Sequence, residues 1–122
     1  MWRRRNSQAI EAVLHSLGLF GTSTAMLQML CAIRLAHADV YLVKDMMSRL
    51  YPAVARHFEG ASVSSVERNL RSIRDKQWAK GDVDLLRKMA GFNLQEKPTT
   101  GEFIDIIRYY MEREGLFDQI MF

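Results

Sequence analysis

Residues 63–78 constrain the fold most strongly, because their apolar side chains recur with the period of a helix. At 100° per residue, one arc of about 80° collects Val63, Val66, Leu70, Ile73 and Gln77. The opposite arc holds only polar and charged side chains, namely Ser64, Glu67, Arg68, Arg71, Ser72 and Asp75. The stretch therefore predicts an amphipathic helix with a narrow buried stripe and a long exposed face centred on arginine.

The rest of the chain carries the same helical signal. No stretch reads as a set of alternating strands, and turn-forming residues are few, with two prolines and seven glycines in 122 residues. A hydrophobic content of 48% with 25% charged residues is typical of a folded domain with one core. We expect an all-α fold, a compact bundle of about six helices. Residues 1–6 are expected to form a basic tail or linker remnant, and residues 7–122 a single domain.

Glycines, prolines and capping residues mark the expected helix ends. Helices are predicted at residues 7–17, 23–38, 40–50, 51–58, 62–78, 82–90 and 100–114. Ser7 is the expected N-cap of the first helix, and the second is apolar almost all round, which suits a central helix. In the third, the residues expected to face the core are Leu42, Val43, Met46, Met47 and Leu50. Thr99 and Glu102 have the spacing of a capping box before the last helix.

The short helix 51–58, a turn containing Gly60 and the arginine-bearing helix together outline a helix-turn-helix. In such a unit the second helix enters the major groove, where a guanidinium can read guanine O6 and N7 and a carboxylate can accept from cytosine N4. Residues 62–80 contain five cations and two anions, an excess equal to the net charge of +3 of the whole chain. The side chains expected to contact phosphates are Ser62, Ser64, Ser65, Arg74 and Lys76.

Two alternatives remain open for this helix. Its charges could simply be solvated and paired at i,i+4 spacing, as Arg71 with Asp75 would be. Glu67 also has two interpretations. If Ser64 is the N-cap, Glu67 folds back onto the helix terminus, whereas with Ser62 as the cap it is free to face a base.

Other chemistry has little support in the sequence. His15, His37 and His57 fall on three different predicted helices without a metal-ligand spacing, so no metal site or cofactor is expected. Cys31 is the single cysteine, lies among apolar residues and is expected in the core. No catalytic motif is present, which argues against an enzyme. The most apolar region, residues 25–43, carries Arg34, His37 and Asp39, so we expect no membrane span and a cytoplasmic protein.

The order of these features resembles the C-terminal DNA-binding effector domain of the stage 0 sporulation protein A family of sporulation response regulators. The motifs that carry the resemblance are "AIEAVLHSLG", "LYPAVARHF", "SSVERNLR", the Trp78-x-x-Gly81 spacing and "KPTTGEFI". The resemblance implies an all-α effector domain that binds a short promoter element and regulates transcription. It assigns base reading to Glu67, Arg68 and Arg71. Ser72 stands where the family commonly has a histidine, so the preferred site is expected to differ there.

The resemblance also implies partners. They are double-stranded DNA with an element resembling TGTCGAA, and the RNA polymerase sigma factor through residues 81–94. The free domain is expected to be a monomer, with two copies side by side on tandem sites. The family joins this domain to a phosphorylated receiver, for which 122 residues leave no room. Either the sequence is a piece cut from a longer regulator or it belongs to a relative without a receiver, so phospho-control is not assumed. The alternative function is a protein-interaction module that modulates sigma factor or a full-length relative without specific DNA binding.

Overall fold

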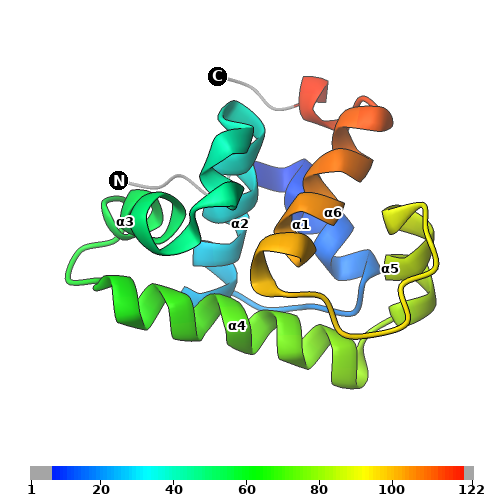
Figure 1. Cartoon of the computed structure of the whole chain (residues 1–122), viewed down its shortest axis with the longest axis horizontal. Helices are drawn as coiled ribbons and strands as arrows, with labels where there is room; N and C mark the ends of the chain where they lie inside the picture. The colour runs from blue at the N-terminus through cyan, green and yellow to red at the C-terminus, as the bar shows by residue number, and fades with distance from the viewer. Residues whose placement is uncertain (1–6, 120–122) are drawn as a thin grey trace.

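The computed structural model describes residues 7–119 and is built from helices around one core (Figure 1). The six α-helices of this described part are α1 (Gln8–Ser16), α2 (Thr24–Ala38), α3 (Tyr51–Ala55), α4 (Val63–Lys80), α5 (Val83–Ala90) and α6 (Thr100–Arg113). Shorter elements within residues 7–119 are η2 (Val40–Lys44), η3 (Met46–Leu50) and η4 (Leu116–Gln119). There is no strand between residues 7 and 119, so the all-α prediction with about six helices is confirmed. The expected tail, residues 1–6, lies outside the described residues.

Helix α2 is the central helix, as its apolar composition predicts. It packs against α4, α6, α3 and α1, and Met29, Ile33 and Ala36 are fully buried along it. Cys31 is buried in the same core, and this burial raises the pKa of its thiol to about 12, although Arg34 opposes the shift. The thiol therefore stays protonated and serves as a small apolar side chain.

The segment before α3 differs from the single helix expected at residues 40–50. It forms the 3₁₀-helix η2 and then the π-helical turn η3. The Asp45 carboxylate accepts a hydrogen bond from the Ser48 N–H at 3.2 Å, which starts a new turn and changes the helical register. As a result Met47 is 59% exposed, so its predicted core position is wrong, whereas Leu50 is buried as predicted.

The two helix starts expected from the sequence have different outcomes. Ser7 lies at the N-cap position of α1, but its side chain makes no capping hydrogen bond, and its buried hydroxyl has no partner among the described residues. The capping box of α6 is confirmed. There the Thr99 N–H donates to Glu102 at 2.8 Å, and the Glu102 N–H donates to the Thr99 hydroxyl at 3.1 Å.

Helices α3 and α4 form the helix-turn-helix. Helix α3 continues from η3 with Pro52 in its first turn, where a missing N–H breaks no helical hydrogen bond. Gly60 then takes a left-handed φ of 77° in the turn, and α4 runs across the bottom of the molecule in Figure 1. The two helices pack against each other, and α4 also packs on α2 and α6. One side of α4 therefore faces the core.

The far end of α4 is fixed to the α1–α2 connection. The Gln77 Nε2 donates to the carbonyl of Leu17 at 3.3 Å and to that of Asp82 at 3.1 Å, and the Asp82 N–H also donates to Leu17. Gly81 lies so close to this junction that a Cβ there would stand 2.4 Å from the Leu17 carbonyl oxygen. The Trp78-x-x-Gly81 spacing therefore has a steric reason at position 81.

Candidate nucleic-acid interface

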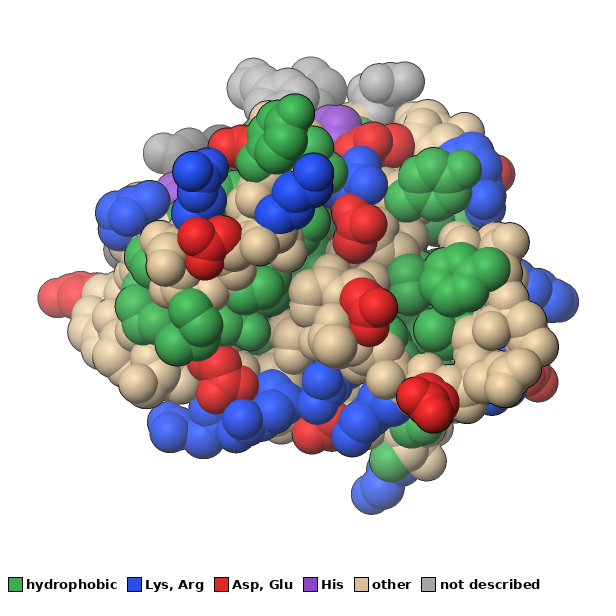
Figure 2. Space-filling model, viewed as in Figure 1, with side chains coloured by type: hydrophobic (Ala, Val, Ile, Leu, Met, Phe, Trp, Pro, Cys, Tyr) green, Lys and Arg blue, Asp and Glu red, His purple; other side chains and the backbone are tan. Residues whose placement is uncertain are grey.

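Helix α4 has one buried side and one exposed side, as its periodicity predicts. Val66, Leu70, Ile73 and Gln77 are buried against the core. The residues exposed away from this stripe are Ser64, Arg68, Arg71, Ser72, Lys76 and Ala79, and Lys80 is exposed at the end of the helix. Lysine and arginine side chains gather along the lower edge of the molecule, over α4 (Figure 2). The exposed side of α4 therefore presents a row of cationic side chains in this view.

The start of α4 is closed by two serines. The Ser65 N–H donates to the Ser62 hydroxyl at 3.1 Å, and the Ser62 N–H donates to the Ser65 hydroxyl at 3.1 Å. Ser62 is thus the N-cap, which settles the choice between Ser62 and Ser64. Glu67 takes no part in the cap, and the Ser64 hydroxyl makes no hydrogen bond within residues 7–119. The first turn is consequently capped by side chains of α4 and its N-cap residue.

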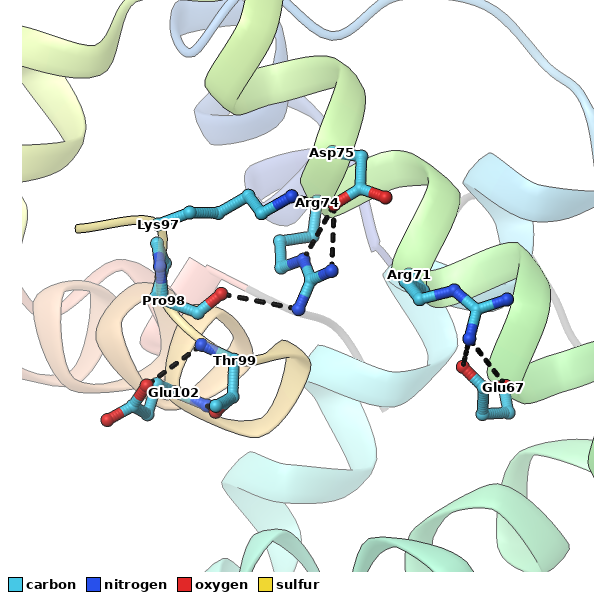
Figure 3. A network of polar contacts seen from close by, with 8 residues as sticks. All are labelled: Glu67, Arg71, Arg74, Asp75, Lys97, Pro98, Thr99 and Glu102. Carbon is cyan, nitrogen blue, oxygen red and sulfur yellow. Dashed lines mark hydrogen bonds and ion pairs between the residues drawn. The ribbon is translucent and has the colours of Figure 1, made fainter.

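Glu67 instead pairs with Arg71 one turn further along the helix. The Arg71 Nη1 lies 3.1 Å and 3.0 Å from the two carboxylate oxygens of Glu67 (Figure 3). Both side chains keep solvent access, with 49% of Arg71 and 28% of Glu67 exposed. The i,i+4 pairing of Arg71 with Asp75 considered above does not form, since Asp75 has other partners. The pair presents guanidinium donors and carboxylate acceptors side by side.

Arg68 differs from its neighbours in having no internal partner. It is exposed and makes no hydrogen bond or ion pair within the described part of the chain. All five of its N–H donors are therefore available to a ligand. Ser72 and Lys76 follow at i+4 and i+8 on the same exposed side and are likewise without partners among residues 7–119.

Arg74 lies on the flank of α4 and is only 14% exposed. Its Nε and Nη2 donate to Asp75 Oδ1 at 3.0 and 2.7 Å, and its Nη1 donates to the Pro98 carbonyl at 3.4 Å (Figure 3). Asp75 accepts a further hydrogen bond from Lys97 Nζ at 2.9 Å. The hydrogen bonds from Lys97 and Arg74 hold the pKa of Asp75 below its usual range. Arg74 is thus engaged mainly with the protein itself.

Lys97 is absent from the residues that sequence reasoning singled out. It lies in the loop between α5 and α6, 22 positions from its partner Asp75, so no periodicity links the two. The only signal in the sequence is its place in "KPTT", directly before the capping box of α6. Prediction from the helix alone could not find it.

Residues 81–94, the segment expected to touch sigma factor, include α5 and the turn after it. Asp84, Lys88 and Phe92 are exposed there. Gly91 ends α5 in the left-handed conformation.

Between residues 7 and 119, no three His, Cys, Asp or Glu side chains come together as a group that could hold a metal ion. Among those residues there is also no helix long and apolar enough to cross a membrane.

Comparison with known protein families shows which family the chain belongs to. Residues 4–111 match the family described as "Sporulation initiation factor Spo0A C terminal". The chain belongs to this family. The Spo0A C-terminal domain is a DNA-binding transcription-regulator domain without enzymatic activity, and the resemblance drawn from the sequence is confirmed. The match contains α1 to α5, the helix-turn-helix and most of α6.

Proposed function

We propose that the chain is a sequence-specific transcription regulator that inserts the helix of residues 62–78 into the major groove of DNA. The observation that carries the proposal is the exposed side of α4, where Arg68 has no partner in the described chain and Arg71 is held by Glu67. Helix α4 has 18 residues and is therefore about 27 Å long, with a diameter of about 10–12 Å. A major groove about 12 Å wide accepts such a helix.

Base reading is proposed for Glu67, Arg68, Arg71 and Ser72. A free guanidinium at Arg68 suits bidentate donation to guanine O6 and N7. The ion pair with Glu67 restricts the Arg71 rotamer, which lowers the entropy lost when Arg71 binds a base. A serine hydroxyl can donate to or accept from any of several bases, so we expect weaker discrimination at the base pair that Ser72 faces.

Phosphate contacts are proposed for residues that flank this row. Ser64 and Lys76 are exposed and have no partner within residues 7–119. Ser62 and Ser65 use their hydroxyls in the capping box, so we expect them to contribute chiefly by ordering the first turn of α4. Arg74 has little free surface, and we propose that it contributes charge to the phosphate backbone rather than a direct hydrogen bond.

Fluorescence anisotropy with a labelled duplex containing TGTCGAA and a scrambled duplex of equal composition tests this proposal. We expect tighter binding to the first duplex and affinity that falls steeply as salt rises. Arg68→Ala or Arg71→Ala should weaken specific binding by about 1–3 kcal/mol and reduce discrimination between the duplexes. Lys44→Ala is the control, because Lys44 lies on η2, which packs on α2 and α6. It should bind as the wild type does.

The alternative, a protein-interaction module, predicts different results. Equal and weak binding to both duplexes would rule out specific readout, and no binding even at low salt would favour the interaction module. Fully specific binding that depends on Arg68 would exclude the module as the main function.

The partner proposals are narrower. We expect a free monomer and two copies side by side on tandem elements, so a tight dimer without DNA in sedimentation would contradict the proposal.

For the proposed sigma-factor contact through residues 81–94, support comes from the exposed Asp84, Lys88 and Phe92. Lys88→Glu should then reduce transcription from a promoter carrying the element while leaving DNA affinity in place. A cytoplasmic, nucleoid-associated location belongs to the same proposal.

A further inference from the structure

Asp75 raises a problem for any DNA-binding surface on α4. Its Cα lies on the same side of the helix as Arg68, only 20° away in helical projection at 100° per residue. A free carboxylate at this place would face the phosphate backbone and repel it. The structure therefore has to neutralise or redirect this charge.

Two cations from different elements surround the Asp75 carboxylate. Arg74 donates to it from the helix itself and also reaches the Pro98 carbonyl. Lys97 donates to it from the loop between α5 and α6 at 2.9 Å (Figure 3). The three side chains together carry a net charge of +1. This part of the surface therefore remains cationic despite the carboxylate of Asp75.

The two cations differ in what they offer to a ligand. Arg74 is 14% exposed, whereas Lys97 is 42% exposed. An ammonium group has three N–H donors, and Lys97 uses one of them on Asp75. The other two are available to a phosphate oxygen. Lys97 is therefore the member of the group that can contact DNA.

The loop that carries Lys97 is itself held in place. Leu94 and Pro98 are buried on either side of Lys97, and Arg87 Nε donates to the Leu94 carbonyl at 2.8 Å. Thr99 follows directly and caps α6. A lysine on a fixed loop, with its ammonium held by Asp75, loses less conformational entropy on binding than a free surface lysine does.

We propose that Lys97 is a phosphate-contacting residue outside the recognition helix, and that Asp75 is the positioning residue that holds its ammonium beside α4. This inference rests on the proposed DNA binding by α4 and adds a contact from a second element. Lys97 contacts the backbone beside the groove that α4 occupies, so it adds affinity equally on every sequence. Asp75 acts through Lys97 and does not itself contact DNA.

Lys97→Gln tests the contact by anisotropy on the TGTCGAA and scrambled duplexes across a salt series. Loss of one phosphate contact should reduce the slope of log K against log salt by about 0.9 and weaken binding at 0.1 M salt roughly 8-fold on both duplexes. Lys44→Gln, which removes the same charge from η2, should change neither quantity to that extent. Circular dichroism checks that both variants are folded.

Asp75→Asn, alone and with Lys97→Gln, tests the positioning. If Asp75 positions Lys97, the effect of Lys97→Gln should shrink in the Asp75→Asn background. If Asp75 only neutralises Lys97, the effect should grow there, and the positioning is then wrong. Wild-type binding with an unchanged slope in Lys97→Gln overturns this inference alone, while no wild-type binding to either duplex overturns the proposed function and the inference with it.

Discussion

The junction at Gly81 gives the sharpest test of how α4 is held. A Cβ at this position would lie 2.4 Å from the Leu17 carbonyl oxygen and 2.7 Å from the Gln77 carbonyl oxygen. Both atoms belong to backbone, which cannot turn away as a flexible side chain can. Gly81 itself has φ −89° and ψ −171°, a conformation open to any residue, so the cost of Gly81→Ala is purely steric.

The magnitude follows from what must move. Overpacking of a well-packed junction costs about 1–3 kcal/mol. Displacement of Leu17 also weakens the hydrogen bonds that its carbonyl accepts from Asp82 and Gln77, at about 1 kcal/mol for each bond that is lost. We therefore expect Gly81→Ala to lower the free energy of unfolding by about 2–4 kcal/mol.

Urea denaturation followed by circular dichroism measures this loss, with Gly60→Ala as the matched control. At Gly60 a Cβ would meet nothing within 4 Å, and only the left-handed φ of 77° costs energy, about 1–2 kcal/mol. The entropy that alanine removes from the unfolded chain is the same in both variants and cancels. A Gly81→Ala variant that is no less stable than Gly60→Ala would refute the steric account of the Trp78-x-x-Gly81 spacing.

Three further predictions follow from the caps, the ion pairs and the core. Ser62→Ala should lower the free energy of unfolding by about 0.5–2 kcal/mol, while Ser64→Ala should have almost no effect in the same urea titration. The pKa of Asp75 is lowered in the folded state by its hydrogen bonds with Lys97 and Arg74. The stability that these contacts supply is therefore present above the ordinary pKa of the carboxyl, about 3.8, and is lost as the pH falls below that value. Asp75→Asn should therefore lose less stability than the wild type between pH 6 and pH 3, and an equal loss would contradict this. Cys31 should react with a thiol reagent only after unfolding in urea, and fast reaction of the native protein would show that the thiol is not buried.

Much of the fold could be predicted because helical periodicity and caps are local signals. The buried stripe of α4 follows from the spacing of Val66, Leu70 and Ile73, and the Thr99 capping box from two residues three positions apart. The register of residues 40–50 could not be predicted in the same way. The side chains of Asp39 and Asp45 cap separate turns there, and this interruption turns Met47 outward.

In the candidate interface, too, only the features that depend on the helix itself could be predicted. The exposure of Arg68, Arg71 and Ser72 follows from the helix alone, so sequence analysis could place them on one side of α4. The partner of each charge depends on rotamers and on tertiary structure. Glu67 therefore pairs with Arg71, whereas Asp75 pairs with Arg74 and with a lysine from a distant loop.

The central claim is that Arg68 and Arg71 read guanine in the major groove, and a chemical change in the DNA tests it most directly. Each guanine of the TGTCGAA duplex is replaced in turn by 7-deazaguanine, which lacks the N7 acceptor, and binding is measured for the wild type, Arg68→Ala and Arg71→Ala. We expect one replacement to weaken wild-type binding by on the order of 1 kcal/mol but to leave the binding of one of the arginine variants unaffected. Equal losses in all three proteins, or no loss in any, would contradict major-groove readout by these arginines.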